Sequence, residues 1–190
     1  MRIAYIAWGT LILEPDCLLI RGSWERNGPE LPVEFARISD DGRVTLVLQP
    51  GAKPITTYSV VADQETLELA RENLRLREGP KRCKTRARGE WIASVDQVGT
   101  SRGRVEEEEL RSIRKWVRNK GYDAAVWTAI PPRLSHPKHG SIHSLTVDGI
   151  VDYLRLVKPE VREMTRSYFR NVPLEVQTGL RHGIEQAMGW

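Results

Sequence analysis

The sequence predicts an α+β fold in which a small mixed or antiparallel sheet, curled like a barrel, is flanked by helices. Two observations favour this class. Short β-branched or alternating segments fill the first sixty residues, and segments with helical periodicity dominate the last sixty. The chain has 190 residues, of which 40% are hydrophobic and 28% charged, so we expect a single globular domain over residues 1–190 with a sizeable core.

The expected strands are runs of β-branched, aromatic or alternating apolar residues that end at turn signals. Asp40-Asp41-Gly42 predicts a hairpin turn between two of them, and Pro50-Gly51 predicts a second turn. The strands cover residues 2–8, 31–38, 43–48, 55–62 and 124–130. Because most of the links are short, an antiparallel or mixed sheet is favoured.

The expected helices carry apolar residues along one face at the spacing of a 3.6-residue turn. The first is capped by Asp63 and ends at Gly79-Pro80; the second has an acidic first turn and ends at Gly121. Three more begin at Thr146, Pro159 and Pro173, in a helical part that covers about residues 144–190.

Positive charge concentrates in a basic segment at about residues 80–104, which has no clear periodicity apart from a short strand near 91–95. Such a segment can attract an anionic metabolite, a nucleic acid or an acidic partner. The residues expected to make this contact are Lys81, Arg82, Lys84, Arg86 and Arg88. A solvated loop without a partner is the alternative, because Trp91 alone offers an aromatic platform for a base.

The two cysteines and the hydropathy pattern indicate a compartment. Cys17 and Cys83 are far apart and lack a C-x-x-C spacing, which predicts a reducing environment and no disulfide framework. No apolar run approaches the roughly 18 residues of a membrane span, and the N-terminus lacks a signal-peptide pattern. We therefore expect a cytoplasmic protein without a membrane partner.

The first strand runs into a glycine turn formed by Trp8, Gly9, Thr10 and Leu11. Gly9 allows the backbone to turn where a side chain would block it, so the amides of Thr10 and Leu11 can point at a ligand. A buried strand followed by a small-residue turn is a common way to build an anion or oxyanion site. The alternative is a turn with no ligand.

Glu78 is the strongest candidate for proton transfer. On an ideal helix it lies about 20° from Leu67 and about 40° from Leu74, so it projects along the apolar face. It also lies in the last helical turn, where the helix dipole disfavours a carboxylate. Both placements disfavour the charged form and suit a group that exchanges protons near neutral pH. An ion pair with Arg71, Arg75 or Arg77, or an exposed helix end, is the alternative.

Three histidines follow the pattern His136-x-x-His139-x-x-x-His143, a spacing at which imidazoles can bind zinc. Pro137 and Gly140 place them in a loop, and no cysteine or acidic residue is near them in sequence, so we expect no metal. The chain also lacks a phosphate-binding loop, a dinucleotide fingerprint and the G-x-S-x-G motif of serine hydrolases, and no cofactor is expected.

Residues 7–15, Ala-Trp-Gly-Thr-Leu-Ile-Leu-Glu-Pro, resemble the Y-G-S-L-I-W-x-P signature of the gamma-glutamylcyclotransferase-like superfamily, most closely its ChaC-type, glutathione-degrading branch. The helix end at residues 73–78 looks like the family's L-D-x-R-E segment, whose glutamate is the catalytic acid/base. The strands at 35–39 and 43–48 and the strand at 124–130 keep the family's order. Trp8, Thr10 and Leu13 stand where the family has tyrosine, serine and tryptophan.

The resemblance implies a lyase that closes a γ-glutamyl amide or peptide to 5-oxoproline and releases the amine. Glu78 would act as acid and base, residues 8–11 would bind the substrate, and Arg37 would meet a substrate carboxylate. Neither a metal nor an organic cofactor is needed. Two alternatives stay open: a different lyase or transferase reaction, and a non-catalytic module that binds a small ligand in the same pocket and a nucleic acid or protein through the basic segment.

Overall fold

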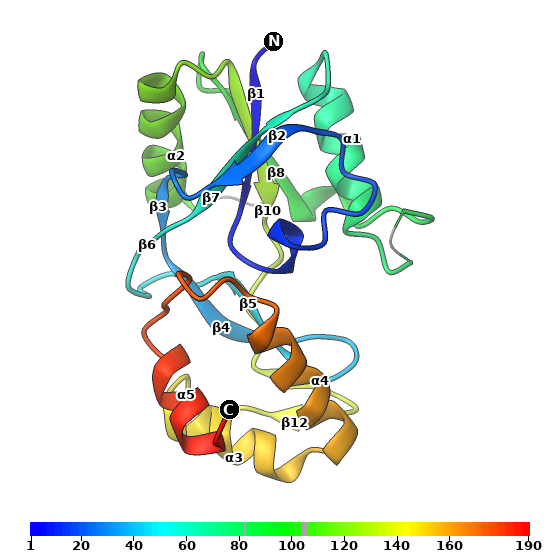
Figure 1. Ribbon diagram of the computed structural model, residues 1–190, viewed down its shortest axis with the longest axis vertical. Coiled ribbons are helices and arrows are strands. Elements are labelled where there is room, and N and C mark those ends of the chain that lie inside the picture. The colour runs from blue at the N-terminus through cyan, green and yellow to red at the C-terminus, as the bar shows by residue number, and fades with distance from the viewer. Residues whose placement is uncertain (82, 104–105) are drawn as a thin grey trace. The chain divides into compact units, whose positions relative to one another are not determined.

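The computed structural model describes residues 1–81, 83–103 and 106–190 (Figure 1). Arg82 and Arg104, which the charge pattern singles out, therefore lie outside the described residues. The chain divides into two compact units, each made of two stretches of sequence. The first unit contains Met1–Leu31 and Thr56–Ile130, and the second contains Pro32–Ile55 and Pro131–Trp190.

The first unit is built on a six-stranded mixed sheet with the order β2-β7-β1-β10-β8-β9. Its strands are β1 (Ile3–Ala7), β2 (Ile20–Glu25), β7 (Tyr58–Ala62), β8 (Ile92–Asp96), β9 (Ser101–Arg102) and β10 (Ala124–Thr128). β1 runs parallel to β10, with Ile3 opposite Ala124, and the other neighbouring strands are antiparallel. The apolar sequence of β1 is explained by this place in the sheet, because all five of its residues are buried.

Two helices cover this sheet. α1 (Leu67–Arg77) contacts β8 and β10, and α2 (Glu107–Lys120) contacts β3, β8 and β10. Figure 1 shows the two helices on opposite sides of the sheet. The α1 side holds a hydrophobic cluster in which Tyr5 of β1 and Leu74 of α1 take part. Both faces of the central strands are therefore buried, as their continuous apolar sequences require.

The second unit contains the hairpin of β4 (Val33–Ile38) and β5 (Val44–Leu48), the small pair β11 (Ser135–His136) and β12 (Gly140–Ser141), and three helices. The helices are α3 (Val147–Leu156), α4 (Pro159–Arg170) and α5 (Arg181–Met188). α4 packs on β5, and α3 packs on α5. The ring of Phe35 on β4 stacks on Phe169 of α4 at a centroid distance of 3.9 Å, which anchors the core of this unit.

Short elements complete the chain. Two single-turn 3-10 helices, η1 (Thr10–Ile12) and η2 (Gly89–Trp91), lie in the first unit. β3 (Glu30–Leu31) and β6 (Ile55–Thr56) lie where the chain leaves and re-enters that unit. In the described part of the chain, no helix has both the length and the apolar character that crossing a bilayer requires.

The α+β class is confirmed, but the barrel is not: the described strands form no closed barrel. The six-stranded sheet has open ends at β2 and β9, and β4 and β5 form a separate two-stranded sheet. A barrel would require hydrogen bonds between the first and the last strand of one continuous sheet. The hairpin turn at residues 40–42 is confirmed, since the Ser39 amide donates to the Arg43 carbonyl at 2.9 Å and Gly42 has φ +90°.

Two helix starts differ from the prediction. Thr66, not Asp63, caps α1: its hydroxyl accepts a hydrogen bond from the Leu69 amide at 3.2 Å, while Asp63 pairs with Arg21 at 2.6 Å. No helix begins at Pro173, because the chain there forms turns until α5 begins at Arg181. The predictions for Thr146 and Pro159 are confirmed. Gly121 ends α2 in the left-handed conformation, also as predicted.

Candidate active site

The glycine turn after β1 has the expected form. Gly9 precedes η1, and the Ile12 amide donates to the Gly9 carbonyl at 3.1 Å. Among the described residues, no acceptor is found for the backbone amides of Thr10 and Leu11. An N–H group without an acceptor can donate to a ligand, which is the role that the sequence predicts for these two amides. The Trp8 side chain is only 5% exposed and belongs to the core, and Leu11 is also buried.

Glu78 lies at the end of α1, where it is the C-cap residue. Its amide donates to the Leu74 carbonyl at 2.9 Å, which continues the helical pattern. Its side chain is 16% exposed, so the carboxylate is mostly shielded from water. Oε1 accepts a hydrogen bond from Arg77 Nη1 at 2.7 Å. The ion pair that the sequence left open as an alternative is thus present, with Arg77 as the partner.

Arg77 joins Glu78 to the segment that follows η1. Its side chain is 4% exposed, and Nη2 donates to the Glu14 carbonyl at 2.6 Å. Nε lies 3.8 Å from the Asp16 carboxylate, beyond hydrogen-bond distance, and it is buried without an acceptor among the described residues. One guanidinium therefore holds two parts of the predicted site together: the chain that leaves the glycine turn and the carboxylate of Glu78.

Asn73 provides a second connection, one helical turn before Arg77. Its Nδ2 donates to the Cys17 carbonyl at 2.9 Å, and its Oδ1 accepts from the Leu19 amide at 2.8 Å. The Tyr5 hydroxyl lies 3.2 Å from the same Oδ1 and 3.1 Å from the Ala70 carbonyl. Burial raises the pKa of Tyr5, so the phenol stays a neutral donor that supports this contact.

Cys17 and Cys83 form a disulfide bond with a Cα–Cα distance of 5.8 Å. The expectation that the cysteines have no disulfide is therefore wrong. The two cysteines are 66 residues apart, so the sequence did not suggest that they form a bond. They meet because α1 brings residue 83 back to the segment before β2. Since the Cys83 amide donates to the Leu76 carbonyl and Asn73 holds the Cys17 carbonyl, the end of α1 places both partners.

The basic segment is ordered against α1 where it is described. Ala87 is buried, and its amide and carbonyl both bind Arg75, at 2.8 and 2.7 Å. The side chains of Lys81, Lys84, Arg86 and Arg88 are exposed. Arg86 pairs with Glu72 at 3.1 Å, and Arg88 lies 5.2 Å from the centroid of the Trp91 ring. The segment thus presents basic side chains from a fixed backbone.

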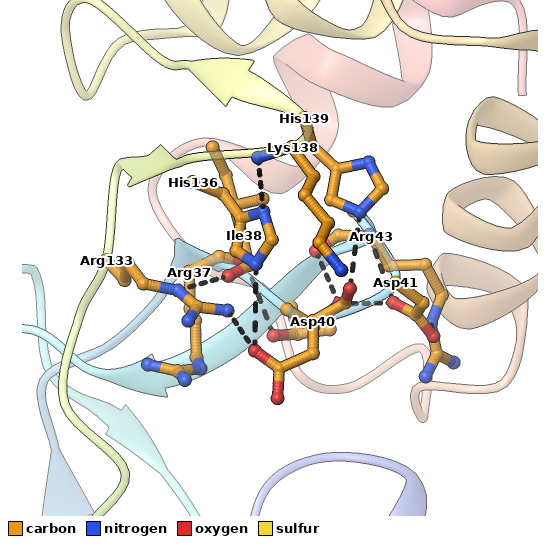
Figure 2. A network of polar contacts seen from close by, with 12 residues as sticks. Arg37, Ile38, Asp40, Asp41, Arg43, Arg133, His136, Lys138 and His139 are labelled. Atoms are coloured by element: carbon orange, nitrogen blue, oxygen red, sulfur yellow. Dashed lines mark hydrogen bonds and ion pairs between the residues drawn. The ribbon is translucent and has the colours of Figure 1, made fainter.

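Arg37 belongs to the second unit, whereas Glu78 and residues 8–11 belong to the first. Its Nη1 donates to the Pro131 carbonyl at 2.6 Å, and the residue is 8% exposed. Burial lowers the pKa of Arg37 to about 10, and the neighbouring Arg133 guanidinium adds to this effect. Arg37 therefore takes part in a polar network of its own unit, shown in Figure 2.

Two of the three predicted histidines lie in the same network (Figure 2). The rings of His136 and His139 are 4.8 Å apart, and His136 Nε2 lies 3.8 Å from the Asp40 carboxylate. Arg133 Nη2 donates to that carboxylate at 2.7 Å. In the described residues, no group of three or more histidine, cysteine or acidic side chains is arranged to hold a metal ion. His143 is exposed.

Comparison of the chain with protein-family models, with curated proteins and with solved structures finds no match in any of the three.

Sequence reasoning missed Asn73 and Arg77 as organisers of this region. A signal was present, because the two lie four residues apart and therefore on one face of α1, beside the buried Leu74. A polar pair at this spacing next to an apolar face indicates contacts with a neighbouring segment. The identity of that segment could not be read from the sequence.

Proposed function

We propose that the first unit is the catalytic part of a gamma-glutamylcyclotransferase-like lyase, which closes a γ-glutamyl amide or peptide to 5-oxoproline. One observation carries the proposal: Arg77 connects the shielded carboxylate of Glu78 to the chain that leaves the glycine turn. The two motifs that resemble the family, at residues 7–15 and 73–78, are far apart in sequence and are joined by this side chain. The unused amides of Thr10 and Leu11 provide donors for negative charge.

In the proposed reaction, the α-amine of the substrate attacks its own γ-carbonyl and forms a five-membered ring. Glu78 accepts a proton from the α-ammonium, which makes the nitrogen a nucleophile, and then donates that proton to the leaving nitrogen. The C–N bond to the leaving amine breaks as the ring amide forms. Because the attack is intramolecular, holding the substrate in a folded conformation supplies much of the rate. Arg37 has no part in this proposal, since it belongs to the second unit.

Each group in the site has a defined task. Arg77 donates a hydrogen bond to Glu78 Oε1 and would hold the carboxyl group in place for the proton transfer. The amides of Thr10 and Leu11 would bind the oxyanion that develops on the γ-carbonyl, and loss of one such donor typically costs about 10²–10³ in rate. No step requires a metal or an organic cofactor.

The test is Glu78→Gln, assayed for 5-oxoproline and free amine with a panel of γ-glutamyl amides and dipeptides. We expect the variant to lose about 10²–10⁴ in kcat, because the amide can neither accept nor return the proton. The melting temperature should change little. Glu72→Gln is the matched control: it lies on the same helix, its side chain is 50% exposed, and it should keep full activity. Wild-type turnover by Glu78→Gln would remove the mechanism.

We propose as a second candidate that the basic segment binds a polyanion, such as a single-stranded nucleic acid or an acidic protein. This is favoured by the four exposed basic side chains on a backbone that Arg75 and the disulfide hold in place. The two functions use different parts of the first unit and are separated by different assays. The salt dependence of binding to a single-stranded nucleic acid tests this candidate.

A further inference from the structure

The disulfide between Cys17 and Cys83 joins residues 13–19 to the segment 79–88, and the described residues of both segments have neither helix nor strand. Both cysteines are half-buried residues, so neither belongs to the fully buried core. Each segment is also attached to α1 without the disulfide. Arg77 and Asn73 hold the first, and hydrogen bonds from Cys83 and Ala87 to main-chain carbonyls of α1 hold the second. The fold therefore does not depend on the S–S bond to bring these segments together.

The backbone on both sides of the disulfide is in a disfavoured conformation. Asp16, directly before Cys17, has φ +52°, and Cys83 itself has φ +61°. In the part of the chain that the structure describes, no other residue except glycine has a positive φ. The left-handed region is unfavourable for residues with a Cβ atom, and it persists where the surroundings enforce it. The two described residues other than glycine that adopt this conformation, Asp16 and Cys83, both lie at the disulfide. Breaking the bond therefore allows both turns to relax.

The two sulfur atoms have different surroundings. The Cys17 amide donates a hydrogen bond to Cys83 Sγ at 3.2 Å. A donor at this place stabilises negative charge on the Cys83 sulfur. In thiol–disulfide exchange the sulfur that better carries negative charge leaves faster. Cys83 is thus the better leaving group, and Cys17 is the sulfur that a thiol attacks.

We propose that Cys17–Cys83 is a site of reversible thiol exchange with a small-molecule thiol, which opens without unfolding of the first unit. A thiolate attacks Cys17 Sγ, the S–S bond breaks, and Cys83 leaves as a thiolate that takes up a proton. A second thiol then attacks the mixed disulfide and releases Cys17 as a thiol. In total, two thiols are oxidised to one disulfide, and two electrons and two protons pass to the cysteines.

Opening the disulfide frees one attachment of residues 13–19, the segment whose Glu14 carbonyl binds Arg77. Residues 13–19 contain Glu14 and Asp16, which surround the guanidinium that pairs with Glu78. The thiol state of the protein therefore controls how tightly this segment is held beside α1. The inference does not depend on the lyase proposal, because each of its measurements can be made on a protein without cyclotransferase activity.

The first experiment treats the native protein with 2-mercaptoethanol, which has no γ-glutamyl group, and traps free thiols with iodoacetamide for peptide mass spectrometry. We expect both cysteines to be alkylated without denaturant. Hydrogen exchange should become several-fold faster in residues 13–19 and 79–88 and stay unchanged in β1 and β10. The inference is overturned if alkylation requires denaturant, if exchange rises throughout the sheet, or if both thiols are already free before 2-mercaptoethanol is added.

The second experiment uses a limiting amount of 2-mercaptoethanol with iodoacetamide present from the start. The expected product carries mercaptoethanol on Cys17 and the alkyl group on Cys83. The reverse product, or equal amounts of both, would contradict the assignment of the leaving sulfur. The variant Cys17→Ser/Cys83→Ser is the folding control: it should keep the near-ultraviolet circular dichroism of the native protein and match the exchange of the reduced form. A molten double variant would show that the bond is a structural requirement and not a switch.

Discussion

Two arginine side chains, Arg77 and Arg181, are almost entirely buried, and both bind main-chain carbonyls of neighbouring segments. Arg181 is 1% exposed and donates to the carbonyls of Phe169, Val172, Pro173 and Val176. A guanidinium has five N–H donors in a rigid plane, which allows one side chain to satisfy several carbonyls at once. This explains why the chain after Pro173 forms turns and not the predicted helix: its carbonyls are held by Arg181.

Glu34 is the buried acid of the second unit, with 4% of its surface exposed. Its carboxyl group accepts hydrogen bonds from the Thr178 hydroxyl at 2.5 Å, from the Phe35 amide at 2.9 Å and from the Leu180 amide at 3.2 Å. Burial raises the pKa of Glu34, and these hydrogen bonds offset only part of the effect. The folded protein therefore binds a proton at Glu34 more tightly than the unfolded chain.

Because Glu34 binds its proton more tightly in the folded protein, the free energy of unfolding should fall as pH rises. The stability contributed by the protonated carboxyl group is fully present below the unfolded-state pKa, near 4.5, and is lost as pH rises through the higher folded-state pKa. Each tenfold difference in proton affinity corresponds to about 1.4 kcal/mol. Glu34→Gln should remove this pH dependence, although it lowers stability overall, because its amide group faces the N–H of Leu180. Urea unfolding at a series of pH values from 4 to 8 measures the effect.

The control for this prediction is Glu160→Gln, which removes an exposed carboxylate from the same unit. Its unfolding free energy should vary with pH in parallel with that of the wild type. Equal pH profiles for Glu34→Gln and the wild type would contradict the assigned role of burial.

At the scale of single elements, the end of α1 is set by a close backbone approach at Gly79. This residue is buried, and a Cβ atom placed on it would overlap the Thr85 carbonyl oxygen. The backbone at Thr85 can therefore pack against the helix end only if residue 79 has no side chain. Glycine is needed here for space, since its φ lies outside the left-handed region.

We expect Gly79→Ala to lower the free energy of unfolding by about 1–3 kcal/mol, because backbone atoms must move to make room for the methyl group. Gly89→Ala is the matched control: a Cβ atom there meets nothing within 4 Å, and its φ is also outside the left-handed region. It should leave stability unchanged or raise it by up to about 1 kcal/mol. Chemical denaturation of both variants tests the difference, and equal effects would rule out the proposed clash.

The helices and strands that were predicted correctly have their signals within one short segment. The strand that was missed depends on a partner far away in sequence. α2 was found with its terminal Gly121, since its acidic first turn, apolar stripe and closing glycine are all within one segment. β2 was missed because four of its six residues are exposed, so its sequence does not show the alternation of a half-buried strand. β2 exists because it pairs with β7, whose partner residues are about 40 positions away in sequence.

The whole chain carries a net charge of +4, so polyanion binding, the second candidate function, can be tested through its salt dependence. The probe is a single strand of 20 thymidine nucleotides, with its binding followed by fluorescence anisotropy at several salt concentrations. If phosphates contact the basic segment, log K falls linearly with log salt, with a slope of about −0.7 for each contact. The variant with Lys81, Lys84, Arg86 and Arg88 all changed to Gln should bind more weakly and with a shallower slope.

The control for this measurement changes the same number of charges elsewhere in the first unit. It replaces four exposed basic residues of α2 with Gln, namely Arg111, Lys115, Arg118 and Lys120. We expect this variant to bind like the wild type. If both quadruple variants lose affinity equally, the attraction comes from net charge alone and the basic segment has no special role.

Local patterns in the chain were enough to predict the α+β class, most helices and strands, the hairpin turn at Gly42 and the two motifs on which the lyase proposal depends. These features follow from periodicity, capping and turn chemistry, which act over a few residues. Only the tertiary structure decided that β1 pairs with β10, that Cys17 bonds to Cys83, and that Arg77 binds the segment after η1. It also decided that Arg37 and Glu78 belong to different units. Contacts between residues far apart in sequence depend on how the whole chain packs, and no short stretch of sequence carries that information.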